Sequence, residues 1–528
     1  MGEFDDLLAK VADKRAEGLD AARPDMVARA RADGKPTARE RLALLVDPGS
    51  FLEWGALAEP THDTDENKHL YGPGDAVVAG TAEVDGRPVS IVNLDATVLG
   101  GSISVTGGTK MDRALSWSLH HGQPYVLFAE GGGHRIQDGL NSKHFAHGGG
   151  TRSMGTQFAL HGALSGWVPT ACAVTGVGFA GPTNFAMLCD FAVMVRGSST
   201  IGMTGPALVR AGIGEIAEAD DLGGARMQAD RNGAADLAVD STEEAVSAIR
   251  LYLSYLPSNA SMPPPCVPCD DPADRPTPEL RDLVPVNLAT PYNMLSVIES
   301  VADLGSVFEL KPTHAGNVIT ALGRIGGRPV GFIANQPAVR GGVLDSAASD
   351  KAARFVSLCD AFGLALVYLV DIPGFLIGTE AEESNLVKHA VRLLHELGQA
   401  TVPRYSVVLR KGYGLGYYAM CGGRSFGAEL AVAWPQAELA AMSIEGAVDV
   451  AYRRRFADAD DPVQARQDLI DDIRTRTGAL HGAAGFGIDD VIDPADTRRL
   501  LARSLARSGW RRPPLHPNPG RFHPVQPV

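Results

Sequence analysis

The chain has 528 residues, of which 45% are apolar and 21% charged, and this composition is typical of a globular protein with sizeable cores. The net charge of −14 and the pI of about 5.5 argue against a nucleic-acid partner. Residues 1–18 are charged and lack the apolar core of a signal peptide. Together with six scattered cysteines, these features predict a reduced, cytoplasmic protein without a membrane span.

Residues 1–55 have a charged, helical pattern. Thr37 stands three residues before Glu40, ahead of the apolar run LALLV, and this spacing predicts a capping box at a helix start.

An internal repeat follows. DGRPVSIVNLDATVLGG (85–101) and GGRPVGFIANQPAVRGG (326–342) are related by an offset of 241 residues. The same offset joins Arg87 to Arg328, Gly100 to Gly341, Lys110 to Lys351, Arg113 to Arg354, Gly122 to Gly363 and Gly133 to Gly374. One ungapped offset over so long a window indicates that a whole domain was duplicated.

Each repeat predicts a hairpin, a helix and an apolar strand. Asp85-Gly86 and Gly326-Gly327 are hairpin signals, and residues 109–122 and 349–363 have helical patterns. The apolar run 364–370 stops at an aspartate, which indicates a buried strand and not a membrane segment. Strand–helix–strand alternation predicts an α/β fold with parallel sheets.

A proline-dense stretch, 257–285, separates the repeats and cannot form a regular helix or central strand. We therefore expect an N-terminal domain over 1–260, a linker over 261–285 and a C-terminal domain over 286–528. The linker holds the CxxC pair Cys266 and Cys269, but zinc needs about four ligands and no second pair exists. No metal is expected.

Two glycine-rich turns, GVGFAGPTNF (176–185) and RKGYGLGYYAM (410–420), follow apolar strands and lead into helical sequence. Such turns present backbone N–H groups to negative oxygen, whether a phosphate or an oxyanion formed during reaction. Gly176, Gly178 and Gly181 satisfy GxGxxG, but no acidic residue follows at the spacing of a dinucleotide site. GGTK (107–110) and HGGGTRS (147–153) lack the spacing of a triphosphate loop. The alternative is that both glycine-rich turns only allow tight packing and take no part in a reaction.

The chain resembles the carboxyltransferase (β) subunits of biotin-dependent acyl-CoA carboxylases of the propionyl-CoA and methylcrotonyl-CoA carboxylase type. The resemblance covers almost the whole chain and rests on motifs in the family's order: TARERLALLVDPGSF, VLGGSIS, GGGHRIQDG, LSYLP, DPADRPTPEL, NQPAV, KAARFVSLCDAF, DIPGFLIGTEAE and RKGYGLGYYAM. It implies two tandem crotonase-like domains of the ClpP/crotonase superfamily, which would account for the duplication.

The resemblance also implies an activity. Such a subunit transfers a carboxyl group from carboxybiotin, carried on a separate protein, to the α- or vinylogous carbon of an acyl-CoA through an enolate. Two backbone oxyanion holes serve the reaction, and the acyl-CoA hole corresponds to Ala180 and Gly181, the biotin hole to Leu415 and Gly416. The implied substrate-binding residues are Gly132, Gly133, His134, Arg135 and Tyr418, and those on the biotin side are Gly374, Phe375 and Tyr413.

This chain departs from the family at several of these positions. Pro182 follows Gly181 where the family has alanine, and we expect it to favour extended geometry at Gly181. Leu415 replaces a glycine and requires a negative φ. Tyr418 stands where propionyl-type enzymes have aspartate, and His134 where they have alanine. We therefore expect an acyl pocket unlike that of an ordinary propionyl-CoA enzyme, with His134 either contacting the acyl group or merely packing.

The matched lysines and arginines of the repeat need a separate interpretation. Because the duplicate keeps both Lys110 and Arg113, we expect Lys351 and Arg354 to stabilise the fold near a helix start through ion pairs. Binding of CoA phosphates by this pair is the alternative.

The expected partners follow from what the sequence lacks. It contains neither a biotin-attachment sequence of the AMKM type nor an ATP loop, so biotin carboxylase and the biotin carrier must be other chains. The family implies a homo-hexamer. A decarboxylase or transcarboxylase on the same fold and a non-catalytic scaffold are the alternatives.

Overall fold

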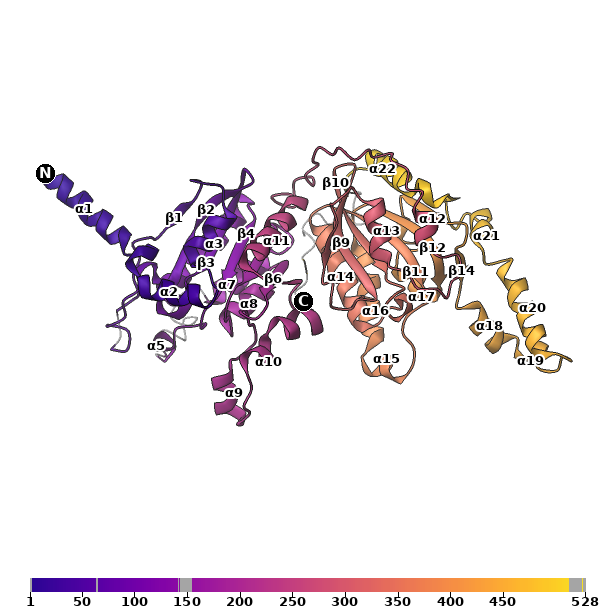
Figure 1. The fold of residues 1–528 in the computed structure, drawn as a ribbon, viewed down its shortest axis with the longest axis horizontal. Helices are drawn as coiled ribbons and strands as arrows, with labels where there is room; N and C mark the ends of the chain where they lie inside the picture. Colours follow the sequence, from indigo (N-terminus) through magenta and orange to yellow (C-terminus); the bar gives the residue numbers. More distant parts are fainter. Residues whose placement is uncertain (1, 63–64, 141, 143–153, 512–524, 526–528) are drawn as a thin grey trace. The chain divides into compact units, whose positions relative to one another are not determined.

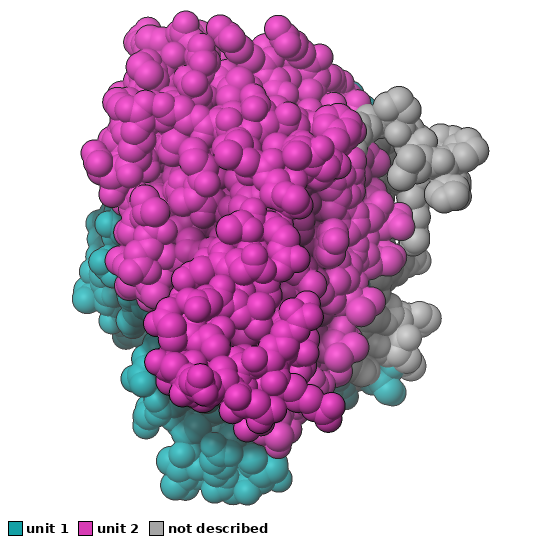
Figure 2. All heavy atoms as spheres, turned by 90° about the vertical axis from the view of Figure 1, so that its right-hand side faces the viewer, with its two compact units in different colours: residues 1–262, 524–528 teal, residues 263–523 magenta. Residues whose placement is uncertain are grey.

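The computed structural model describes every residue except 1, 63–64, 141, 143–153, 512–524 and 526–528. Its internal contacts divide the chain into two compact units, Met1–Met262 with residues 524–528, and Pro263–His523 (Figure 2). Each unit is an α/β structure with its own sheet (Figure 1) and its own apolar core. The predicted fold class and the duplication are therefore confirmed.

The sheet of unit 1 has the strand order β1-β2-β3-β4-β5-β6-β7. The strands from β1 to β3 pair antiparallel, and those from β3 to β7 pair parallel. Their bounds are β1 Leu52–Trp54, β2 Val77–Val84, β3 Arg87–Leu94, β4 Tyr125–Ala129, β5 Thr170–Val174, β6 Phe191–Val195 and β7 Leu237–Val239. Strands β4, β5 and β6 are buried along their whole length, as apolar parallel strands covered on both faces should be.

The helices of unit 1 connect these strands. They are α1 Glu3–Ala16, α2 Pro24–Ala32, α3 Ala38–Leu45, α4 Val105–His121, α5 Ile136–Gly139, α7 Met154–Leu164, α8 Gly181–Met187, α9 Pro206–Ile213, α10 Ala219–Gly223 and α11 Thr242–Tyr255. The capping box at α3 is confirmed, because the Thr37 side chain accepts from the Glu40 N–H and the Glu40 carboxylate accepts from the Thr37 N–H.

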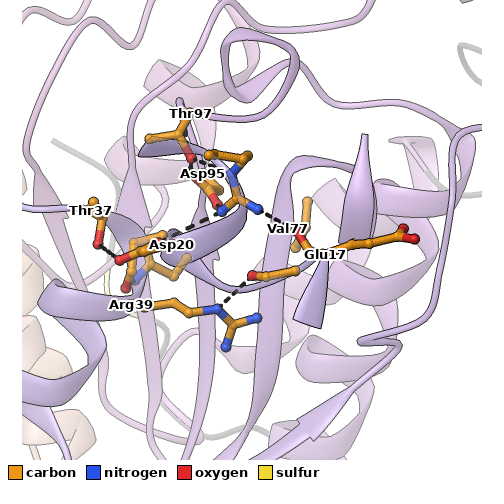
Figure 3. Close-up of polar contacts among 12 residues, drawn as sticks. Glu17, Asp20, Thr37, Arg39, Val77, Asp95 and Thr97 are labelled. Carbon is orange, nitrogen blue, oxygen red and sulfur yellow. Dashed lines mark hydrogen bonds and ion pairs between the residues drawn. The ribbon is translucent and has the colours of Figure 1, made fainter. Parts of the chain in front are cut away.

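Polar contacts attach the N-terminal helices to the sheet (Figure 3). Arg23 donates to the Glu17 carbonyl at 3.0 Å and to Asp95, directly after β3, at 3.2 Å. Thr37 donates to Asp20 at 2.6 Å, and Arg39 to the Gly18 carbonyl at 2.9 Å. These bonds fix the start of α3 beside the end of β3.

Unit 2 repeats this plan with the strand order β15-β13-β12-β11-β10-β9-β8, and β14 pairs with β12. The bounds are β8 Phe308–Leu310, β9 Val318–Ile325, β10 Arg328–Asn335, β11 Ala365–Ile372, β12 Arg404–Tyr413, β13 Leu430–Ala433, β14 Glu438–Ala440 and β15 Asp490–Val491. Every residue of β11 is buried, so the prediction of a buried strand at 364–370 is confirmed. Within the described ranges, no helix has the length and hydropathy that crossing a membrane requires.

The helices of unit 2 are α12 Leu280–Leu283, α13 Met294–Val301, α14 Ser346–Ala361, α15 Thr379–Glu383, α16 Leu386–Gln399, α17 Gly414–Ala419, α18 Ile444–Ala451, α19 Arg453–Ala457, α20 Pro462–Arg474, α21 Ala479–Ala484 and α22 Thr497–Arg507. Helices α18 to α20 form a small core of their own from Ile444, Val448 and Ile470. This satellite core is a separate cluster from the main core of unit 2, and Figure 1 shows α18, α19 and α20 beyond β14, outside the sheet.

The duplication holds at the level of single elements. Strands β2 and β9, β3 and β10, and the starts of α4 and α14 all differ by 241 residues. Both predicted hairpins form, β2 with β3 and β9 with β10, each antiparallel in full register.

The proline-rich segment crosses the boundary between the units, and its residues 263–285 belong to unit 2. The Val267 N–H donates to the Gly327 carbonyl and the Thr277 N–H to the Ala495 carbonyl, both at 3.0 Å. A segment without ladder hydrogen bonds can thus be ordered by a few bonds to a neighbouring sheet and helix.

Candidate functional site

Two pairs of glycine turns follow buried parallel strands. In unit 1 one turn, 131–134, follows β4, and the other, 176–181, follows β5. In unit 2 the turns 373–375 and 414–416 follow β11 and β12. Because neighbouring parallel strands end at the same sheet edge, each unit brings its two turns together, where ligands of α/β sheets commonly bind.

The first turn of each unit is held by the same backbone bonds. In unit 1 the Ile103 N–H donates to the Gly133 carbonyl, and the Ile103 carbonyl accepts from the Arg135 N–H, both at 2.8 Å. In unit 2, Leu344 makes the equivalent bonds, to the Gly374 carbonyl at 3.1 Å and from the Leu376 N–H at 2.7 Å. The repeat offset therefore extends to hydrogen bonds, and it makes His134 the counterpart of Phe375.

The second turn of unit 1 uses its two predicted donors differently. Ala180 has φ 62° and ψ −117°, an unusual conformation for a residue with a Cβ, and its N–H already donates to the Gly202 carbonyl at 2.9 Å. Gly181 is the first residue of α8, so its N–H has no acceptor within the helix. Of the predicted pair, Ala180 therefore already has an acceptor for its N–H, whereas the N–H of Gly181 is not bonded within α8.

The two turns of unit 1 meet at Gly133. A Cβ built on Gly133 would lie 3.7 Å from the Gly181 nitrogen. Pro182 occupies the first helical turn, where the missing N–H is harmless, so the expected extended geometry at Gly181 is wrong. Instead, Ala180 takes up the strained conformation that the turn requires.

The second turn of unit 2 begins helix α17. Gly414 has φ 59°, whereas Leu415 has a negative φ, as its Cβ requires. A Cβ on Gly416 would lie 3.0 Å from the Gly374 Cα and 2.9 Å from the Ile372 side chain. Gly374 and Gly416 are therefore in close contact, and the two turns of unit 2 meet as those of unit 1 do.

His134 is a neutral histidine beside the first turn. Both ring nitrogens are covered and without a hydrogen-bond partner in the described part of the chain. Burial lowers the pKa of His134, and nearby Asp138 only partly opposes this effect. Asp138 is itself buried, with one carboxylate oxygen accepting from Asn67 at 3.1 Å.

Three other predicted side chains have different surroundings. Arg135 is buried and pairs with Asp75 at 2.7 Å, so its guanidinium is engaged within the fold. Tyr413 is buried and donates to Glu438 at 2.8 Å, and burial raises its pKa. Tyr418 is half-exposed, with its ring against Tyr417. Gly132 is exposed and free of close contacts.

The repeated lysines are buried and saturated by carbonyl groups. Lys110 donates to the carbonyls of Gly55, Gly74 and Val77, and burial lowers its pKa to about 8. Lys351 donates to Lys311 and His314 at 2.8 and 2.9 Å, and burial lowers its pKa to about 7. For the lysines, burial and these bonds agree with the predicted role in the fold, but the partners are carbonyls and not the carboxylates of the expected ion pairs.

Sequence reasoning missed two buried carboxylates at the strand ends. Glu130 directly follows β4 and pairs with Arg41, and Asp371 lies near the end of β11 and pairs with Arg410 at 2.8 Å. The signal was available, because 130 and 371 differ by the repeat offset of 241 and both are acidic.

No group of three or more potential metal ligands occurs among residues that the structure describes. The segment 147–153, weighed above as a phosphate loop, lies outside those residues.

Comparison with known proteins identifies the class to which this fold and these turns belong. The family model for the carboxyl transferase domain matches residues 29–516, and the chain belongs to this family. The propionyl-CoA carboxylase carboxyltransferase subunit of Haloferax mediterranei is 38% identical over 95% of this chain and 96% of its own. The methylmalonyl-CoA carboxyltransferase 12S subunit of Propionibacterium freudenreichii subsp. shermanii is 38% identical over 92% and 91%.

A solved structure agrees with these relatives. The chain superposes with a TM-score of 0.92, at 36% identity and over 99% of both chains, on the transcarboxylase 12S hexamer crystallised with methylmalonyl-CoA and methylmalonic acid. The tandem crotonase-like fold is thereby confirmed, as is the carboxyltransferase resemblance.

Proposed function

We propose that this chain is the carboxyltransferase subunit of a biotin-dependent acyl-CoA carboxylase. It transfers a carboxyl group from carboxybiotin, borne by a separate carrier protein, to the α- or vinylogous carbon of an acyl-CoA. One observation carries the proposal: both units place a pair of glycine turns at the ends of neighbouring parallel strands, in a chain that matches the carboxyl transferase family over 29–516.

Unit 1 supplies the acyl-CoA hole. The Gly181 N–H, together with the backbone of Gly133 and His134, stabilises the enolate oxygen of the thioester, and Ala180 holds the turn in place through Gly202. A single donor of such a hole contributes on the order of 3 kcal/mol to the barrier. Gly132 and Arg135 complete the acyl-CoA side. No neighbour lies close to Gly132, and Arg135 supports the turn through its ion pair with Asp75.

Unit 2 supplies the biotin hole. The N–H groups of Leu415 and Gly416, in the first turn of α17, hold the ureido oxygen as negative charge develops. Gly374 and Phe375 border the hole, and Tyr413 fixes its base through Glu438. Biotin freed of its carboxyl group would accept the α-proton, so no side chain of this chain is required as a base.

The acyl group differs from propionyl. His134 and Tyr418 both replace smaller residues of propionyl-type enzymes, and neither ring nitrogen of His134 has a hydrogen-bond partner among the residues that the structure describes. In this family the first domain of one subunit faces the second domain of another, so Tyr418 lines the acyl pocket across that interface. Residues 1–260 thus form the acyl-CoA side and residues 286–528 the biotin side of a cytoplasmic homo-hexamer.

Transfer assays with defined partners test the proposal. The purified chain is mixed with carboxylated biotin carrier protein and a panel of acyl-CoAs, and both labelled carboxyacyl-CoA and free CO₂ are measured. Transfer supports the carboxylase. Release of CO₂ without transfer would indicate a decarboxylase, and absence of both reactions a scaffold.

A further inference from the structure

Arg41 connects the ends of three neighbouring strands in unit 1. Its side chain is 1% exposed, and it extends from α3 beneath the glycine turns. Its guanidinium donates to the Asn93 side chain at 2.9 Å and the Leu94 carbonyl at 2.7 Å at the end of β3, to Glu130 after β4, and to Thr175 after β5 at 3.0 Å. One cation therefore fixes the spacing of β3, β4 and β5 where the turns begin.

These contacts continue directly into the turns. Glu130 precedes Gly131, whose N–H donates to the Val177 carbonyl at 2.7 Å and so joins the two turns. A Cβ on Gly176 would overlap the Glu130 carboxylate, so this carboxylate packs against the second turn as well. A shift of the Arg41–Glu130 pair would consequently move both turns of the acyl-CoA hole.

Unit 2 contains an equivalent arrangement built from different elements. Asp371, the repeat counterpart of Glu130, accepts from Arg410 at 2.8 Å, from Tyr292 at 3.0 Å and from the Lys411 N–H at 3.2 Å. The register of β11 against β12 shifts at this point, so three residues of β12 lie opposite Asp371. This bulge directs Arg410 at the carboxylate and sets the course of the chain into the turn 414–416.

The duplicated domains thus retained the carboxylate but obtained the arginine from α3 in one unit and from β12 in the other. Both arginines are completely buried, and a buried ion pair stabilises a fold weakly compared with well-packed apolar residues. Fold stability alone therefore does not account for two independent solutions at the same place under the donor turns.

We propose that Arg41 and Arg410 are positioning residues, Arg41 for the acyl-CoA hole and Arg410 for the biotin hole. The inference rests on the proposed function. Neither guanidinium contacts the reacting atoms; each holds strand ends at the separation that aligns backbone donors. Misplacing such donors by about 1 Å lowers turnover by roughly 100-fold, while substrate binding remote from the donors is unaffected.

Arg41→Lys tests the acyl-CoA hole and Arg410→Lys tests the biotin hole. Lysine keeps the positive charge but lacks the planar guanidinium that donates several hydrogen bonds at once. Two reactions are measured: transfer to the best acyl-CoA, and release of CO₂ from carboxylated carrier without an acceptor, which needs the biotin side only. For Arg41→Lys we expect kcat of transfer to fall roughly 10- to 100-fold, with KM for acyl-CoA and acceptor-free release within about twofold of the wild type. For Arg410→Lys both reactions slow by a similar factor.

Arg39→Lys is the matched control, because Arg39 lies on the same helix and pairs with Glu53 at 3.0 Å away from the turns. It should leave both reactions unchanged. If thermal unfolding shows that Arg41→Lys is misfolded, Thr175→Val removes a single bond to Arg41, and a several-fold loss of kcat at constant KM is expected.

Equal transfer rates for Arg41→Lys and Arg39→Lys, or loss of acceptor-free release in Arg41→Lys, would overturn the positioning role while the proposed function stands. A wild-type protein that neither transfers nor releases CO₂ would overturn the proposed function itself.

Discussion

His134 is the residue whose chemistry the fold does not require. The repeat places Phe375 at the equivalent backbone position, so a ring without nitrogens is compatible with this turn. His134→Phe keeps a ring and removes the nitrogens, and we expect roughly tenfold lower turnover on the preferred acyl-CoA, which corresponds to about 1.4 kcal/mol. Steady-state kinetics of this variant and of His134→Ala measure the effect. Unchanged turnover in both variants would show that His134 only packs beside the turn and does not act on the acyl group.

His161 should make unit 1 sensitive to acid. Its ring stacks on Phe185, one nitrogen contacts the Gln157 carbonyl at 2.9 Å, and burial lowers its pKa to about 4. A depressed pKa means that the unfolded chain binds the proton more readily, so stability is complete above about pH 6.5 and declines towards pH 4. Phenylalanine binds no proton, so His161→Phe should remove up to about 3 kcal/mol of this acid-induced loss in the free energy of unfolding, because one pKa unit corresponds to about 1.36 kcal/mol.

Urea unfolding of both proteins at pH 7.5, 5.5 and 4.5 measures the difference. His120, which is exposed, provides the control in His120→Phe. Parallel stability profiles for the wild type and His161→Phe would contradict the assignment.

Side-chain chemistry was predictable from the sequence only where it depends on near neighbours. The Thr37 capping box was found because its two residues lie three positions apart. The ion pair of Arg135 with Asp75 spans 60 residues, and the contact of Arg41 with Thr175 spans 134. Tertiary folding alone creates such pairs, so the sequence indicated neither the ion pair of Arg135 nor the contacts of Arg41.

At the scale of elements, the first turn of unit 1 offers a paired test. A Cβ on Gly131 would overlap the Gly101 carbonyl, whereas a Cβ on the adjacent Gly132 meets nothing within 4 Å. Gly131→Ala should therefore lower the free energy of unfolding by about 1–3 kcal/mol, as overpacking does. Gly132→Ala should stay within about 0.5 kcal/mol of the wild type.

Chemical denaturation gives the stabilities, and the transfer assay gives a second result. Because Gly132 is proposed to face acyl-CoA, Gly132→Ala should raise KM although it leaves stability intact. Equal stabilities of the two variants would show that the turn can relax around a methyl group.

The order of strands and helices was predictable to a large extent, since a constant offset of 241 applies to β2, β3 and α4 alike. Local irregularities were not predictable. The contact of the Ala180 N–H with Gly202 and the shifted register at Asp371 depend on strands that meet only in the folded sheet. The pattern of glycines located the turns but did not identify the available donors.

At the scale of the whole molecule, assembly is the first property to measure. The transcarboxylase 12S chain that superposes on this one forms a hexamer. We expect sedimentation equilibrium to give six times the 55.5 kDa of the chain at micromolar concentration. A monomer or dimer that is active in transfer would contradict the proposed assembly.

The duplication in the sequence also predicted two units, and the boundary between the units falls between Met262 and Pro263. Sequence alone could not show that residues 263–285 pack on unit 2, because proline-rich segments have no periodic pattern from which a docking surface can be inferred.

The satellite core of α18 to α20 has a consequence for dynamics. Three buried residues, Ile444, Val448 and Ile470, support this region, whereas β11 is covered throughout. Regions with few buried apolar contacts open by local fluctuations of low free energy. Amide deuterium uptake should therefore be roughly tenfold or more faster in α18–α20 than in β11. These helices would then open locally while the strands that support the turns stay closed.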